Sequence, residues 1–314
     1  MLEAIKLSKT FNDLVAVKSV SFTAKEGEVV GFLGPNGAGK TTTMKMITGF
    51  LTPNEGRVLV NGIDMDKEPI KAKKLMGYLP EGAPIYPDMT VLEFLLFISE
   101  IRGFSGKEKY RRVNDVIEKI TLDGVLGQTI ETLSKGYKCR VGLAQALLHD
   151  PKIIILDEPT DGLDPNQKQE VRNLIKTIAS EKVIIISTHL LEEVEAICDR
   201  VMIINKGKIV VDSTPSQLIE RSVHFNTVNI SLEKTITLAD IKKNLQHISE
   251  IKKIEVLDGE ENILNLRLYL SSNCISLPKV CNFIFQQNWK VINFQVSTGH
   301  LQEVFRKVTQ NHKK

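Results

Sequence analysis

The sequence predicts an α/β fold with a parallel β-sheet and a helical subdomain, followed by a small domain of mixed helices and strands. Strand-like runs alternate with helical stretches over the first 220 residues, and this alternation is typical of a parallel sheet. The segment at about 90–150 has helical periodicity instead, and the pattern shifts again near 213–223. With 314 residues, the chain is long enough for two domains, which we expect at 1–220 and 221–314.

The first domain opens with strand-like runs at AIKLSKTF, VKSVSFTA and EVVGFLG. The third run is apolar on both faces, as a central strand of a parallel sheet is. A glycine-rich turn follows it, and a helix is expected from Lys40 to about Gly49. The later elements are expected, in chain order, as strands at RVLVNG and LMGYLP, helices within TVLEFLLFISEIRGF and KEKYRRVNDVIEKI, a strand at 152–156, a helix at about 165–180, a strand at 182–187, a helix at about 190–198 and a hairpin at 200–211.

The second domain has no glycine-rich motif. Its expected order is strand, helix, strand, strand, helix, strand and a final helix. The expected spans are 224–232, 238–247, 251–257, 262–270, 277–287, 290–296 and 301–308. The order fits a small ferredoxin-like split module. A regulatory role, dimerisation and the binding of a small ligand are all compatible with this domain. Nothing in it resembles a catalytic site, so packing and dimer contacts are the default expectation.

Composition and charge narrow the class of protein. Hydrophobic residues make up 42% and charged residues 25% of the chain, as in ordinary globular proteins. The net charge of +3, without a dense basic block, does not favour nucleic acid as a partner. The four cysteines (Cys139, Cys198, Cys274 and Cys281) have neither CxxC nor metal-binding spacing, so isolated thiols in a reducing compartment are expected. Without a signal peptide or an apolar run of about 20 residues, we expect a cytoplasmic protein unless a partner holds it at a membrane.

The segment GPNGAGKT at 34–41 matches the phosphate-binding pattern G-x-x-x-x-G-K-[ST] between a buried strand and a helix. Its glycines permit a tight turn whose N–H groups point at phosphate oxygens, and the start of the helix adds positive charge. Lys40 is expected to reach the β- and γ-phosphates, and the Thr41 hydroxyl is expected to bind Mg²⁺. The residues expected to contact ATP in this segment are Gly34, Pro35, Asn36, Gly37, Ala38, Gly39, Lys40, Thr41 and Thr42.

Two later strands end in polar residues that narrow the choice among nucleotide-binding proteins. KIIILDEP ends in Asp157, expected in the Mg²⁺ shell, and Glu158, expected to reach the water that attacks the γ-phosphate. KVIIISTH ends in His189, which the parallel order brings to the same carboxyl edge, where it is interpreted as a γ-phosphate sensor. NKGK at 205–208 lacks the Asp of a guanine-reading motif and is interpreted as a hairpin turn, which disfavours GTP.

These motifs, in this order, resemble the ATPase subunit of ABC transporters over residues 1 to about 220. The resemblance implies that Phe11 stacks on adenine and that a short loop runs from Asp161 to Asp164. It also implies a signature loop within ETLSKGYKCRV at 131–141, where Ser134, Lys135 and Gly136 contact ATP. In this family two ATPase copies, identical or similar, dimerise head to tail, and each ATP lies between the P-loop of one and the signature loop of the other.

The loop lengths, GYLPEGAPIYPDMTV and the TGHLQEVFRKVT ending are similar to the export-type group, including ATPase subunits of gliding-motility or multidrug type. There, a separate ATPase subunit drives a separate membrane permease, which implies a location on the inner face of the cell membrane. A soluble ABC ATPase acting on ribosomes or DNA ends is the alternative, although such proteins usually carry two cassettes or a long coiled coil. A nucleotide sensor without hydrolysis is disfavoured by the intact polar residues of the motifs.

Two positions depart from the family pattern. Most members have Gln where this chain has Glu81, which can still bind Mg²⁺ through water but adds repulsion beside the γ-phosphate. The pattern Leu-Ser-Gly-Gly-Gln becomes Leu-Ser-Lys-Gly-Tyr, so Lys135 either reaches a phosphate or points outward, and Tyr137 has no assigned role. Ser134 also fits an ordinary helix start, and the two interpretations are compatible, since a signature loop is itself the start of a helix.

Overall fold

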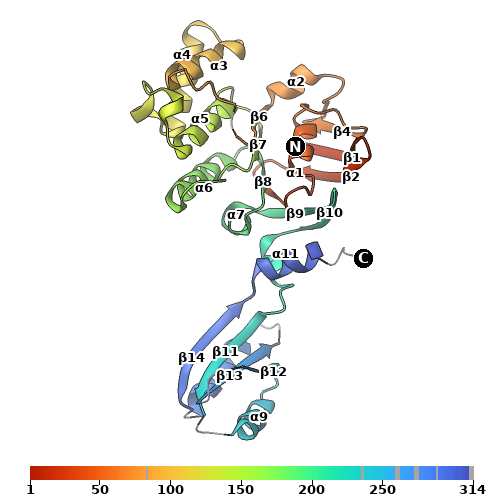
Figure 1. Ribbon diagram of the computed structural model, residues 1–314, viewed down its shortest axis with the longest axis vertical. Coiled ribbons are helices and arrows are strands. Elements are labelled where there is room, and N and C mark those ends of the chain that lie inside the picture. Colours follow the sequence, from red (N-terminus) through yellow and green to blue (C-terminus); the bar gives the residue numbers. More distant parts are fainter. Residues whose placement is uncertain (83, 235–236, 259–261, 272–275, 288, 311–314) are drawn as a thin grey trace. The chain divides into compact units, whose positions relative to one another are not determined.

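The computed structural model describes the chain except residues 83, 235–236, 259–261, 272–275, 288 and 311–314, so that Cys274 lies outside the described part. The chain forms two compact units, Met1–Pro215 and Ser216–Lys314 (Figure 1). The division falls slightly before the boundary expected near 220, within the short helix α8 (Pro215–Ile219). Within the described residues, no helix is both long and apolar enough to cross a bilayer.

A six-stranded sheet forms the centre of the first unit. Its strands follow the order β10-β9-β3-β8-β7-β6, and all neighbouring pairs are parallel except the hairpin of β9 and β10. The strands β3, β7 and β8 are buried along their whole length, which confirms the reading of their continuous apolar runs as central strands. The bounds are β3 (Val29–Leu33), β6 (Met76–Leu79), β7 (Ile153–Asp157), β8 (Val183–Thr188), β9 (Arg200–Asn205) and β10 (Lys208–Ser213).

A second, antiparallel sheet in the same unit makes the expectation of one parallel sheet incomplete. Its order is β2-β1-β4-β5, with β1 (Leu2–Phe11), β2 (Leu14–Ala24), β4 (Glu55–Val60) and β5 (Ile63–Asp64). Two-residue turns join β1 to β2 and β4 to β5, and such short turns permit only antiparallel neighbours. In the second turn Asn61 and Gly62 both have positive φ, the conformation that hairpin turns favour.

Helix α1 (Lys40–Ile47) contacts strands of both sheets, and its Met44 and Ile47 are fully buried in the core shared by these strands. The segment expected to be helical contains α3 (Val91–Ile101), α4 (Gly106–Ile120) and α5 (Lys135–Leu147). A capping box of Thr90 and Glu93 begins α3. The remaining helices of the unit are α2 (Pro69–Lys74), α6 (Pro165–Ala179) and α7 (Leu191–Ile197).

The second unit has the element order expected for a split βαββαβ module. Its four antiparallel strands follow the order β12-β13-β11-β14, and Leu266, Leu268 and Val228 lie fully buried in its core. The bounds are β11 (Phe225–Glu233), α9 (Leu238–Gln246), β12 (Ile251–Leu257), β13 (Ile263–Leu270), α10 (Ser276–Gln286), β14 (Val291–Thr298) and α11 (Leu301–Gln310).

Candidate nucleotide-binding site

The carboxyl edge of the parallel sheet gathers the polar ends of neighbouring strands. The register pairs Leu33 of β3 with Thr188 of β8, and Ser187 of β8 with Asp157 of β7. The loop before α1 therefore begins beside the segments that carry Asp157, Glu158 and His189. Ligands bind at this edge in open parallel sheets because loops diverge there.

The loop at 34–41 reaches α1 through a glycine that no other residue replaces easily. Gly39, at the N-cap of α1, has φ 105°, and a Cβ there would lie 2.6 Å from the carbonyl oxygen of Ala16. The first turn of α1 has no acidic residue, so the positive end of the helix is not neutralised locally. The turn and the helix start thus form a concave set of N–H donors suited to phosphate.

The ammonium group of Lys40 is held inside this loop. Its Nζ donates to the carbonyl oxygen of Gly34 at 2.8 Å and lies 3.4 Å from Oε1 of Glu158. The side chains of Lys40 and Glu158 are only 6% and 9% exposed, so water screens the pair poorly. A phosphate entering the loop would give this lysine an anion to replace the glutamate.

Glu158 bridges two motifs that are distant in sequence. One carboxylate oxygen faces Lys40, and the other, Oε2, lies 2.8 Å from Nδ1 of His189. The backbone of Glu158 has φ 51°, in the left-handed region, while its N–H donates to the carbonyl oxygen of Ser187 at 2.9 Å. This change of backbone direction explains how two consecutive acids at the end of β7 serve different positions, at a conformational cost of about 1 kcal/mol.

Asp157 is buried beneath the phosphate loop, with 1% of its surface exposed. Burial raises the pKa of its carboxyl group, while the hydroxyls of Ser187 and Thr41 counteract this rise. Ser187 donates to Oδ1 of Asp157, but Oδ2 has no hydrogen-bond partner of good geometry among the described residues. A buried carboxylate oxygen without a partner, beside a threonine hydroxyl, fits a hard cation such as Mg²⁺.

A cavity of about 670 Å³ connects these groups. At one end the exposed side chains of Phe11, Leu14 and Val15 form an apolar surface that suits a purine base. The polar side chains of Glu81, Glu158, Asp161 and His189 also line the cavity. The loop residues that line the cavity are Pro35, Asn36, Gly37, Gly39, Lys40, Thr41 and Thr42, whereas Ala38 is buried and Gly34 contributes its carbonyl oxygen to Lys40.

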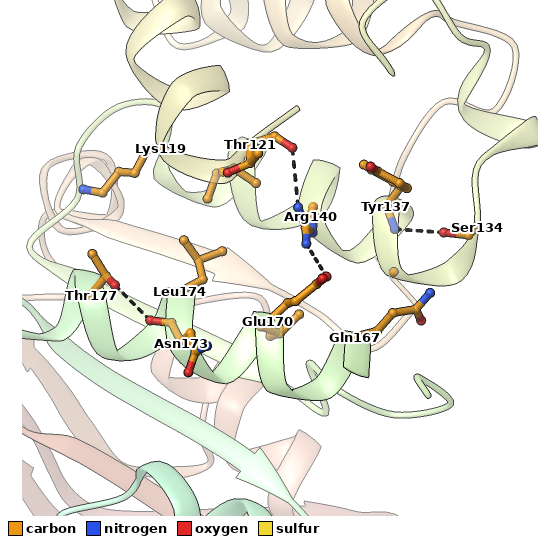
Figure 2. Close-up of a pocket in the computed structure, with 13 residues that line it drawn as sticks. Lys119, Thr121, Ser134, Tyr137, Arg140, Gln167, Glu170, Asn173, Leu174 and Thr177 are labelled. Atoms are coloured by element: carbon orange, nitrogen blue, oxygen red, sulfur yellow. Dashed lines mark hydrogen bonds and ion pairs between the residues drawn. The ribbon is translucent and has the colours of Figure 1, made fainter. Parts of the chain in front are cut away.

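The signature loop does not line this cavity. Ser134 is the N-cap of α5 and accepts a hydrogen bond from the N–H of Tyr137, as an ordinary helix start does (Figure 2). Gly136 is buried against α6, where an added Cβ would lie 2.7 Å from the side chain of Gln167. One chain therefore brings the phosphate loop, Glu158, His189 and Glu81 together and leaves Ser134 and Gly136 outside.

Lys135 neither points freely outward nor lines the nucleotide cavity. Its Nζ lies 2.7 Å from the position that a Cβ on Gly162 would occupy, within the loop from Asp161 to Asp164 of the same chain. Lys135 also shares a cavity of about 420 Å³ with Glu81, Glu158 and Asp161, three acids that line the nucleotide cavity as well. The ammonium of Lys135 therefore adds positive charge to the cavity that these acids share.

Tyr137, without a role in the sequence analysis, packs under Arg140. The guanidinium carbon of Arg140 lies 5.4 Å from the centroid of the Tyr137 ring, a cation–π arrangement. Arg140 also donates to the carbonyl oxygen of Thr121 at the end of α4 and forms an ion pair with Glu170 of α6 (Figure 2). Arg140 thus joins α4, α5 and α6 directly behind the signature loop.

Some residues of the nucleotide cavity, and Arg140 behind the signature loop, were not predicted from the sequence. Phe11 was predicted, but Leu14 and Val15 were not. These two apolar residues directly follow the turn after Phe11, and their position beside it could have indicated that they share the adenine-binding surface. Asp161 was predicted to lie in a short loop but not in the nucleotide site. Arg140 carried no signal, because its partners come from helices that are distant in sequence.

The fold and the site together define a class. A phosphate-binding loop lies between a central parallel strand and a helix, and the carboxylate of Glu158, at the end of β7, pairs with its lysine. This is the arrangement of P-loop nucleoside triphosphatases. The second antiparallel sheet and the helical segment between β6 and β7 distinguish the protein from the simplest members of that class.

Comparison with known proteins identifies the family. Residues 17–161 match the family model of the ABC transporter. The chain is 33% identical over 313 residues to the uncharacterized ABC transporter ATP-binding protein YhcH of Bacillus subtilis, covering 98% of this chain and 96% of that protein. It is 37% identical over 222 residues to the linearmycin resistance ATP-binding protein LnrL of the same organism. This match covers 70% of this chain and 71% of LnrL.

A solved structure supports the same assignment. The dimeric post-hydrolysis state of the ATP-binding cassette MJ0796 with ADP and Pi superposes with a TM-score of 0.62 at 26% identity, covering 68% of this chain and 98% of that chain. The chain therefore belongs to the ABC transporter family. It is an ATP-binding, ATP-hydrolysing subunit of an ABC transporter.

Proposed function

We propose that this subunit hydrolyses ATP in the cavity between Phe11 and Glu158 and so drives export through a separate membrane permease. The observation that carries the proposal is the placement of Glu158 between Lys40, at 3.4 Å, and His189, at 2.8 Å. A carboxylate in contact with both the phosphate-binding lysine and a histidine at the cavity mouth is suited to act on water beside a γ-phosphate.

Binding begins with an exchange of partners at Lys40. The ammonium leaves the Gly34 carbonyl and Glu158 for the β- and γ-phosphates, while the N–H groups of residues 36–41 hold the remaining phosphate oxygens. Phe11 packs against the adenine ring. Because Lys40 no longer faces Glu158, the carboxylate is then free to accept a proton from water.

Hydrolysis needs a base and an oriented water molecule. Glu158 accepts the proton of the attacking water through one carboxylate oxygen, and His189 holds the other oxygen in place and senses the γ-phosphate. Thr41 and Asp157 would hold Mg²⁺, with Glu81 bound through water, and the ion would neutralise phosphate charge. The unpartnered Oδ2 of Asp157 supports this ligand set.

The signature residues act on the ATP of a second subunit. Ser134 and the N–H of Gly136 lie at the start of α5, where the helix N-terminus favours an anion, but outside their own chain's nucleotide cavity. In a head-to-tail dimer they contact the γ-phosphate of the other copy. Lys135 adds positive charge beside this contact. Closure then depends on the γ-phosphate, and hydrolysis releases it.

In this function the subunit is bound to the permease at the inner face of the cell membrane. The test is to tag the subunit, solubilise membranes gently and identify the membrane protein that accompanies it. Export is supported if the co-purified permease and this subunit, in sealed vesicles, move a substrate outward with ATP. Recovery only with ribosomes or nucleic acid would instead support the alternative function.

Replacing Glu81 with Gln should strengthen ATP binding in the absence of Mg²⁺ by about three- to tenfold. The variant removes a negative charge near the γ-phosphate, and repulsion across a few ångströms near a protein surface amounts to about 1 kcal/mol after screening. With Mg²⁺ present the gain should be smaller, because the metal masks the charge. Titration with fluorescent ATP, once in EDTA and once in Mg²⁺, measures the affinity for ATP under each condition. Glu26→Gln, an exposed acid outside the cavity, is the control, and equal gains under both conditions would contradict the placement of Glu81.

Replacing Asp157 with Asn should lower ATP hydrolysis by at least about 100-fold while raising the melting temperature of the nucleotide-free protein at pH 7. Burial raises the pKa of Asp157 in the folded state, so the ionised form destabilises the fold at neutral pH, and stability rises as the pH falls and the group becomes protonated. The difference in melting temperature should therefore shrink toward pH 4. Asn retains the acceptor for Ser187. A variant that melts at a lower temperature at pH 7 would contradict this prediction.

A further inference from the structure

The strand β14 lies at one end of the sheet in the second unit (Figure 1). It pairs with β11 along one side, and no other strand of the described residues pairs with its second side. An edge strand presents a row of unpaired backbone N–H and C=O groups, which is a template for another strand. The opposite end of the same sheet is β12.

The two edges differ in charge. β12 reads IKKIEVL and includes Lys252, Lys253 and Glu255, whereas β14 reads VINFQVST and has no charged residue. Charged side chains, lysine above all, are the usual protection of an exposed edge against pairing with another chain. β12 is therefore protected by charge, whereas β14 lacks this protection and runs without a register shift of its own from Asn293 to Thr298.

Apolar side chains accompany this open edge. Phe294 and Val296 lie opposite Ile230 and Val228, two buried residues of β11, so the core face of the sheet continues onto β14. Val291 and Phe294 still pack partly against that core, whereas Val296 is 38% exposed. Ile292, which lies at the register shift between Asn293 and Val291, is 56% exposed. Phe285 of α10, whose ring lies 5.7 Å from that of Phe294, is 63% exposed and adds apolar surface beside this edge.

We propose that β14 pairs antiparallel with β14 of a second copy of this chain, which joins two four-stranded sheets into one. When a strand pairs antiparallel with the same strand of a second copy, a two-fold axis relates the two copies. Both copies then contribute the same surface, which must be complementary to itself. An uncharged strand meets this condition, because neither repulsion nor an unpaired charge arises at the axis. The exposed side chains of Phe285, Ile292 and Val296 from both copies then cover each other.

This contact differs from the ATP-dependent closure because it requires no nucleotide. It would keep two subunits together after hydrolysis has opened the nucleotide sites. Reclosure would then occur within one assembly, at a high effective concentration, rather than by a new encounter. The proposal therefore assigns the second unit the role of a permanent dimer contact.

Sedimentation of the full chain without nucleotide or Mg²⁺ tests the proposal. We expect a dimer whose dissociation constant increases by at least about tenfold in Ile292→Lys, since the variant places a charge in the contact. Val256→Lys is the matched control, because Val256 is a comparably exposed apolar residue, 42% exposed, on the opposite edge strand β12. A parent chain that is monomeric at tens of micromolar, or equal weakening in both variants, would overturn the proposal, and thermal melting verifies that both variants fold.

Cysteine crosslinking tests the register independently of stability. Positions 292–297 are replaced by Cys one at a time, and the full chain is oxidised, with the parent chain as the control for the native cysteines. Antiparallel self-pairing predicts disulfide formation concentrated at one position or two adjacent ones, nearest the two-fold axis. Crosslinking spread evenly along the strand, or absent at every position, would refute the pairing. Neither outcome would affect the proposed ATP chemistry, which can be measured separately by hydrolysis.

Discussion

Replacing Glu158 with Gln should leave ATP binding intact and lower the rate of ATP hydrolysis by about 10²- to 10⁴-fold, the usual contribution of a general base. Gln has nearly the same shape and can still accept a hydrogen bond from His189, but it cannot take a proton from water. Binding should persist because the phosphate loop and Lys40 are unchanged. The γ-phosphate then remains in place, so the variant should accumulate as an ATP-bound dimer.

Single-turnover hydrolysis measures the first effect. Light scattering with and without ATP measures the second, in chains that also carry Ile292→Lys, so that the contact at β14 does not hide dimerisation by ATP. The control is Glu195→Gln, which changes an exposed acid of α7 outside the nucleotide cavity and should hydrolyse ATP at the parental rate. A Glu158→Gln protein with the parental rate of hydrolysis would exclude Glu158 as the base. If the variant loses hydrolysis but remains monomeric with ATP, the assignment of Glu158 as the base stands. The closure of a dimer around the γ-phosphate would then be excluded.

The parts of the structure that local sequence determines were predictable. Continuous apolar runs identified β3, β7 and β8, and the residues at their carboxyl ends identified the phosphate loop, Asp157, Glu158 and His189. The hairpin at Asn205 to Lys208 followed from its turn residues, with Lys206 and Gly207 both at positive φ. In the second unit, the order of strands and helices followed from alternating periodicity alone.

Long-range pairing was not predictable. The antiparallel sheet required β1 to find β4 across the phosphate loop and α1, and no local pattern encodes that partner. The position of Lys135 against Gly162 and that of Tyr137 under Arg140 depend on the packing of α5 against α6 and the preceding loop. The motif comparison predicted an ATP contact for Lys135 and no role for Tyr137, but the orientation of both side chains is a property of the folded chain.

Replacing Lys40 with Met should weaken ATP binding by about 10- to 100-fold, because the chain loses a charge-assisted hydrogen bond to phosphate worth about 1.5–3 kcal/mol. Hydrolysis should fall at least as far. Equilibrium titration with fluorescent ATP measures the binding. Lys45→Met, which alters a lysine in the last turn of the same helix, outside the cavity, is the control and should bind ATP normally.

The same variant should also destabilise the nucleotide-free protein, since Glu158, 9% exposed, loses the ammonium 3.4 Å away. Removing Lys40 leaves Glu158 with His189 as its remaining side-chain partner among the described residues, so the cost, about 1–3 kcal/mol, is smaller than for a buried charge that loses its sole partner. Adding Glu158→Gln to Lys40→Met removes the carboxylate charge, so the double variant should recover much of the stability while ATP binding stays weak. Denaturant unfolding of the parent, the two single variants and the double variant gives the coupling energy. Additive effects in this cycle would mean that Lys40 and Glu158 do not interact before ATP binds, and the exchange of partners that opens the proposed mechanism would then be wrong.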